Sequence, residues 1–191
     1  ESHMTFLRRS REMIFRRLSP LETRRVLQQT AEVGGRGVDP AALDVMLRVT
    51  QGYPYLVQLM GDFAWRHAPE DGCIGVAAAE AARDQAITAV QDRVVSRAFD
   101  DLSDVDKQFV LSMAEDEDRT KIADLVQRLG VSDQYVQNYK RRLIASGYVE
   151  SDGHGYVRFS LPYLGHYLRT MADDRPLPDD GWGAFPPPAL D

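Results

Sequence analysis

The stretch Thr120–Ser146, TKIADLVQRLGVSDQYVQNYKRRLIAS, predicts two short helices joined by a tight turn. Apolar side chains recur at spacings of three and four residues in its first part, which places on one helix face Ile122, Ala123, Leu125, Val126 and Leu129. Gly130 can end this helix, because glycine adopts positive φ without Cβ strain. Ser132 can cap a second helix, whose buried face we expect to contain Val136, Tyr139, Leu143 and Ile144. The pattern is typical of a helix-turn-helix.

A β-hairpin is predicted directly after this pair of helices. The segment 147–159, GYVESDGHGYVRF, has two β-rich strings on either side of a Gly/Asp turn. A hairpin in this position makes the helix-turn-helix a winged one. Ser103 can cap a helix that precedes it, with Asp106 at the third helical position, and a last short helix is expected over 163–171.

The composition limits the class of protein. A chain of 191 residues with a net charge of −6 is long enough for one large or two small globular domains, and as a whole it does not resemble a non-specific polyanion binder. Its single cysteine, Cys73, can form no internal disulfide and lacks partners for a zinc site. No apolar run approaches the roughly 20 residues that cross a bilayer, and no signal peptide is recognisable. These features favour a cytoplasmic protein without membrane contact.

Upstream of the winged helix, start and stop signals predict a small helical bundle. Ser19-Pro20-Leu21-Glu22 combines a cap, a proline at the first helical position and a glutamate at the third, so a helix should run to about Val33. Asp39-Pro40 begins a second helix that ends at Gly52, and a third, wide-faced apolar helix follows over 56–65. The alanine-rich run from Val76 to Phe99 predicts one long helix or two shorter ones.

Three further segments have a less regular composition. Residues 1–4 look like a cloning remnant, and the basic, amphipathic run Phe6–Leu18 is either the trailing edge of a preceding domain or a segment for nucleic acid or anionic membranes. The acidic block Glu115–Asp118 should lie in a solvated loop, with metal binding as the alternative. The Pro- and Asp-rich tail 172–191 is expected to be a flexible terminus.

The order of several motifs resembles the C-terminal half of AAA+ or STAND-type ATPases: FRRLSPLE, GYPYLVQLMGDFAW, LSDVDKQFVLSMAE, IADLVQRLG and VRFSLPYLGHYLRTM. In those proteins a nucleotide-binding domain is followed by a small helical lid and a winged helix. The resemblance implies a trailing segment of the ATPase domain at 5–18, a lid with its connecting helix at 19–101, and a winged helix-turn-helix domain at 102–171. The missing ATPase domain and further copies of the chain are the protein partners that it implies.

The resemblance also suggests a nucleotide contact. Gly52, Tyr53 and Pro54 match the GxP pattern that lies beside the adenine in STAND relatives, so Pro54 would pack on the base of ATP, held with magnesium by the missing domain. A plain turn between two helices is the alternative interpretation. No G-x-x-x-x-G-K-[ST] motif occurs, and we therefore expect this chain not to hydrolyse ATP. No arginine follows Gly52 before Arg66, which favours the STAND type.

The outward face of the second helix of the pair offers groups that can read double-stranded DNA. The candidates on it are Gln134, Tyr135, Gln137, Asn138, Arg141 and Arg142. Gln and Asn can pair with adenine and Arg with guanine in the major groove. The candidates for phosphate contact are Lys121, Lys140, His154 and Arg158.

Charge leaves a second function open. The segment 103–171 has ten acidic and nine basic side chains, whereas dedicated DNA-binding domains usually carry a positive excess. The winged helix could therefore be a protein-interaction or autoinhibitory module, and six tyrosines could serve it if they are exposed: Tyr135, Tyr139, Tyr148, Tyr156, Tyr163 and Tyr167. The four histidines are scattered without a nucleophile or carboxylate nearby, so no enzyme site is predicted.

Overall fold

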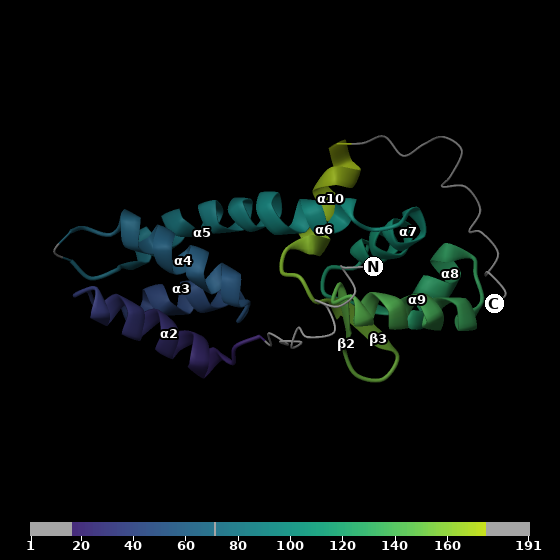
Figure 1. Ribbon diagram of the computed structural model, residues 1–191, viewed down its shortest axis with the longest axis horizontal. Coiled ribbons are helices and arrows are strands. Elements are labelled where there is room, and N and C mark those ends of the chain that lie inside the picture. The colour runs from purple at the N-terminus through teal and green to yellow at the C-terminus, as the bar shows by residue number, and fades with distance from the viewer. Residues whose placement is uncertain (1–16, 71, 175–191) are drawn as a thin grey trace, which may run out of the picture. The chain divides into compact units, whose positions relative to one another are not determined.

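The computed structural model describes residues 17–70 and 72–174, without the side chains of 172–174. The chain divides between Ala82 and Arg83 into two compact units. Each is described by itself (Figure 1). Our predictions for residues 1–16 and for 175–191 lie outside the described part.

Three helices and the start of a fourth form the first unit: α2 (Pro20–Val33), α3 (Pro40–Thr50), α4 (Pro54–His67) and α5 (Val76–Val90). The predicted capping box of α2 is confirmed, since Glu22 N–H donates to Ser19 Oγ over 3.2 Å while Ser19 N–H donates to Glu22 Oε2 over 2.7 Å. Asp39 caps α3 with its side chain alone, which accepts from Ala41 N–H at 2.8 Å. Local capping thus fixes where these helices begin.

The core of the first unit lies where α2, α3 and α4 pack on one another (Figure 1). Leu43, Met46, Leu56 and Met60 are at most 1% exposed there. A short parallel bridge between Val38 and Ile74 ties the loop before α3 to the loop before α5. We predicted that α3 would stop at Gly52; it stops at Thr50, because Gln51 already adopts the left-handed conformation at φ 47°.

The segment that we predicted as one long or two shorter helices is helical from Val76 to Asp100. It comprises α5, one wider π-helical turn η1 (Gln91–Val95) and α6 (Ser96–Asp100). The division between the two units falls inside α5. Val95 and Phe99 are buried in the core of the second unit.

The second unit continues with α7 (Asp104–Ala114), β1 (Arg119–Lys121), α8 (Ile122–Leu129), α9 (Asp133–Ala145), β2 (Val149–Ser151), β3 (Tyr156–Phe159) and α10 (Leu164–Asp174). The strands form an antiparallel sheet in the order β1-β3-β2. The predicted helix-turn-helix and hairpin are confirmed, and the mainly helical fold has the arrangement of a winged helix. We missed β1, which overlaps the start of the stretch Thr120–Ser146 that we had predicted to contain only helices and a turn.

One core joins η1, the helices α6 to α10 and the strands β2 and β3 of the second unit. Phe109, Leu125, Val136, Leu143 and Leu168 are at most 1% exposed in it, and Tyr139 and Ile144 pack against it half-buried. Ala123 is exposed, contrary to our prediction, because the apolar stripe of α8 runs from Ile122 through Leu125 to Leu129 and leaves position 123 at its flank. Among the described residues, no helix is both long and apolar enough to span a membrane.

Candidate nucleic-acid interface

The position of α9 follows from the turn before it. Gly130 takes φ 65° and ends α8, and Ser132 Oγ accepts from Tyr135 N–H at 3.3 Å to start α9. Val136 and Leu143 bury one side of α9 in the core. The opposite side is therefore presented to solvent at a fixed angle, as the second helix of a helix-turn-helix is when it enters a DNA groove.

Three of the predicted base-reading residues form a connected row on the exposed side of α9. Gln134, Asn138 and Arg141 are all exposed. Gln134 Nε2 donates to Asn138 Oδ1 over 3.3 Å, and Arg141 Nη2 donates to the same oxygen. We call these three side chains the α9 row. The shared acceptor aligns polar groups at spacings of four and three residues along one helix face.

Three other candidates lie at the end of β1 or on α9. Lys121 is exposed at the residue before α8, and Gln137 and Lys140 are half-buried on α9. Among the ion pairs of the described residues, none involves Lys121, Lys140 or Arg141. These cations are available to phosphate without breaking an internal pair.

Arg142, in contrast, is held by α7. Its guanidinium pairs with the Asp106 carboxylate, whose side chain is 10% exposed, and Arg142 Nη2 also donates to Ser103 Oγ at 3.3 Å. The same guanidinium lies 4.5 Å from the centre of the Tyr139 ring. For Arg142 to reach a guanine as we predicted, Asp106 would have to lose a partner that it needs because it is buried.

Tyr135 does not face outward as we predicted. It is 8% exposed and stacks on Tyr139, with ring centres 4.6 Å apart. The two rings are four residues apart on α9, so stacking draws Tyr135 into the flank of the core. Burial raises the pKa of the Tyr135 hydroxyl. The other five tyrosines that we considered for a protein interface are half-buried.

The wing presents one cation that is already paired. Arg158 Nε on β3 donates to Glu150 Oε1 on β2 over 2.6 Å. His154 is exposed in the turn between the strands, flanked by Gly153 and Gly155, both at φ 77°. Ile122 N–H donates to Gly155 carbonyl oxygen at 2.9 Å, so the turn is fastened to the first residue of α8. Glu150 and Asp152 make the wing a poor phosphate site.

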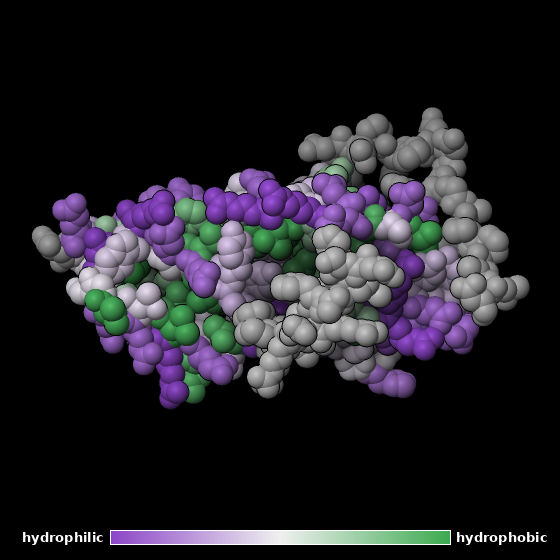
Figure 2. All heavy atoms as spheres, viewed as in Figure 1, coloured by the Kyte–Doolittle hydropathy of each residue, from purple (hydrophilic) through white to green (hydrophobic). Residues whose placement is uncertain are grey.

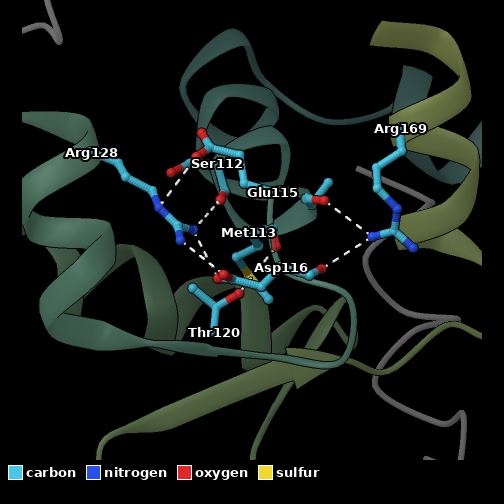
Figure 3. Close-up of polar contacts among 8 residues, drawn as sticks. Ser112, Met113, Glu115, Asp116, Thr120, Arg128 and Arg169 are labelled. Carbon is cyan, nitrogen blue, oxygen red and sulfur yellow. Dashed lines mark hydrogen bonds and ion pairs between the residues drawn. The ribbon is translucent and has the colours of Figure 1, made fainter. Parts of the chain in front are cut away.

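The acidic block is built into the fold by two arginines (Figure 3). Arg128 of α8 donates to both carboxylate oxygens of Asp116 at 2.8 Å and to the Ser112 carbonyl at 2.9 Å. Arg169 of α10 donates to the Asp116 carbonyl oxygen at 3.1 Å. The Thr120 hydroxyl donates to the Met113 carbonyl oxygen, also at 3.1 Å. The Arg128 hydrogen bond holds the pKa of the Asp116 carboxyl below its usual range. We call these contacts the Asp116 cluster.

Internal ion pairs reduce the unpaired positive charge of α8, α9 and the wing. Arg128, Arg142 and Arg158 each face a carboxylate. The acidic block lies at the α7–β1 loop, away in sequence from the α9 row. Where α8 and α9 are visible in Figure 2, their surface is hydrophilic. A solvated, moderately cationic helix face thus remains.

The GxP pattern of the first unit has a structural explanation of its own. Gly52 is at φ 70°, and Leu18 N–H donates to its carbonyl at 2.8 Å. A Cβ at Gly52 would lie 2.1 Å from the Leu18 carbonyl oxygen. Tyr53 is half-buried, which raises its pKa, and Pro54 begins α4. The turn accounts for the glycine and the proline without a nucleotide.

Sequence reasoning missed the partners of Arg142, Arg128 and Arg158. Asp106 lies 36 residues from Arg142, and nothing in the local pattern pairs them. The one hint in the sequence was opposite charge: acidic residues, Asp104 and Asp106, start α7, and α9 ends in basic residues. Among the described residues, no three His, Cys, Asp or Glu side chains gather as metal ligands would.

Comparison with protein families matches part of the second unit. Residues 92–168, from η1 to α10, match a family described as a domain of unknown function, DUF8462. A comparison with curated proteins found no match. The matched segment includes the whole α9 row and the wing.

Proposed function

We propose that the winged helix-turn-helix domain binds double-stranded DNA, with α9 in the major groove. The observation that carries this proposal is the α9 row: three connected polar side chains project from the solvent side of a helix whose other side is buried. The major groove admits a helix of this kind, and base edges there are read by amide and guanidinium groups. Lys121 and Lys140 supply the phosphate contacts in this proposal.

The proposal extends to a role in a longer protein of the AAA+ or STAND type. By the resemblance described above, the first unit would be the lid of an ATPase domain, and DNA binding would respond to the nucleotide held there. Gly52, Tyr53 and Pro54 would form the adenine side of that site. Tyr53 and Pro54 are half-buried, so a base could reach them at the turn between α3 and α4.

Salt dependence tests the DNA proposal. The 191-residue chain is titrated into a labelled duplex of about two helical turns at about 50 and about 200 mM salt. Two phosphate contacts should give a slope of log K against log salt of about −2. The double variant Lys121→Gln, Lys140→Gln should lower the slope to near zero and weaken binding to all duplexes alike.

A matched control separates this effect from loss of charge alone. Arg93 and Arg97 are exposed on η1 and α6, outside the proposed interface. Arg93→Gln, Arg97→Gln removes the same charge and should keep the slope. Arg142 is left intact, because its substitution would leave the buried Asp106 carboxylate unpaired. Equal slopes for the lysine variant and the unchanged chain would contradict the proposal.

A second candidate function is a protein-interaction module. It is favoured by the nearly equal numbers of acidic and basic residues in 103–171 and by the internal pairing of Arg142 and Arg158. An interface of balanced charge suits a protein partner better than a polyanion. The same titration distinguishes the two, because this candidate predicts no duplex binding at the lower salt concentration.

A further inference from the structure

We infer that the α9 row reads guanine, and that Asn138 reads it as a hydrogen-bond donor. This inference rests on the proposed DNA binding and names the bases that the same face selects. It differs from the general expectation that an asparagine on a recognition helix pairs with adenine. The difference comes from the two hydrogen bonds that Asn138 already accepts.

The side-chain amide of Asn138 has one orientation available. Arg141 contacts it through Nη2, and a guanidinium can only donate. The Asn138 atom facing Arg141 must therefore be the acceptor Oδ1. Gln134 Nε2 donates to the same oxygen at 3.3 Å. Both lone pairs of Oδ1 are then used, and the Nδ2 amide group is left with its two donors.

Adenine and guanine make different demands on this amide. A bidentate pair with adenine needs an acceptor for N6–H and a donor for N7, so Oδ1 would have to give up one of its present partners. Guanine presents two acceptors, N7 and O6, in the major groove. The Nδ2 donors of Asn138 match those acceptors without breaking a hydrogen bond within the α9 row. The remaining N–H groups of Arg141 match a guanine as well.

Gln134 offers the opposite polarity. Its Nε2 group donates to Asn138, which leaves Oε1 as the acceptor. Cytosine N4 and adenine N6 are the major-groove donors that fit it. Gln134 and Arg141 are seven residues apart, about 10 Å along a helix, which corresponds to about three base-pair steps. The row therefore selects a short site with guanine opposite Asn138 and Arg141 and a donor base opposite Gln134.

Selection from a duplex pool tests the inference. The full chain is mixed at low salt with duplexes whose centre is randomised, and the retained duplexes are sequenced. The expected result is enrichment of neighbouring guanines on one strand, with a preference of about tenfold over adenine at the position that Asn138 reads. Retained duplexes with adenine at that position would overturn the inference.

One substitution reverses the polarity of the central group. Asn138→Asp replaces the Nδ2 donors with a second acceptor of the same shape, and carboxylates accept from cytosine N4. We expect the selected base at that position to change from guanine to cytosine. Gln127→Glu adds the same charge on the exposed side of α8 and should leave the guanine preference intact. An Asn138→Asp chain that still selects guanine would refute the assignment.

The outcomes separate this inference from the proposed function. If no duplex is retained at low salt, the proposed function fails and the inference fails with it. If duplexes are retained with a normal salt slope but without guanine enrichment, DNA binding stands and the donor assignment of Asn138 is wrong. If guanine is enriched and Asn138→Asp shifts it to cytosine, both stand.

Discussion

Replacing Gly52 should show how much the close contact between Leu18 and the α3–α4 turn stabilises the first unit. Its positive φ costs an L residue about 1–2 kcal/mol, and its missing Cβ leaves room for the Leu18 carbonyl oxygen at 2.1 Å from the Cβ position. We expect Gly52→Ala to lower the free energy of unfolding by more than the cost of φ alone. Urea unfolding followed by circular dichroism measures the loss.

Gly35 provides the control for this prediction. It has a similar φ of 82°, and nothing lies within 4 Å of a Cβ built on it. Gly35→Ala should therefore cost only the conformational part, about 1–2 kcal/mol. If both variants lost equal stability, the contact between Leu18 and Gly52 would not constrain the turn.

At the scale of single residues, the sequence predicts caps and turns well and ion pairs poorly. Ser19, Ser103 and Ser132 act as caps, as we predicted, because a cap is decided within four residues of chain. The outward direction of Tyr135 was wrong, because stacking on Tyr139 outweighs the polarity of one hydroxyl. The pairing of Arg142 with Asp106 joins distant segments, and only the folded packing reveals it.

The Asp116 cluster joins α7, β1, α8 and α10 and should make the second unit sensitive to acid. Arg128 lowers the pKa of the Asp116 carboxyl in the folded state. A lowered folded pKa stabilises the fold at pH values above the unfolded pKa of about 3.9, and this contribution is lost as the pH falls through the folded value. We expect the urea midpoint to drop steeply below about pH 4.

Asp116→Asn isolates the contribution of this carboxylate. At neutral pH we expect the variant to lose about 1 kcal/mol, because the 27% exposed carboxylate is partly screened by solvent. Its midpoint should fall less between pH 6 and pH 3 than that of the unchanged chain. Parallel pH curves for the two proteins would show that Asp116 does not carry the acid sensitivity.

At the scale of elements, helices were predictable and the sheet only in part. The hairpin was evident because two strings of β-formers flank a Gly/Asp turn. The third strand, β1, has only three residues, Arg-Thr-Lys, which are too few for an alternating pattern to show. It pairs with β3, and its Thr120 hydroxyl donates to the Met113 carbonyl oxygen. Both partners lie outside the strand, so the local sequence does not indicate them.

At the scale of the whole molecule, the order of a helical bundle and a winged helix follows from the sequence, but the limit of the second unit does not. We placed the start of the winged-helix domain at residue 102 from the cap at Ser103. The hydrophobic core that contains the winged-helix elements also includes two earlier side chains, Val95 at 0% and Phe99 at 8% exposure. The continuous helical run from α5 to α6 contains no turn signal that could mark a limit.

Two truncated chains test where the domain begins. A chain starting at Arg83 keeps Val95 and Phe99, and a chain starting at Leu102 removes them from a core that contains Val110 and Leu168. Burying each such side chain contributes about 1.5–3 kcal/mol, so the shorter chain should be less stable by about 3–6 kcal/mol in urea unfolding. The family match, which begins at residue 92, includes both side chains. Equal unfolding midpoints for the two chains would place the start of the domain at residue 102 after all, and would make α6 a linker rather than part of the winged-helix core.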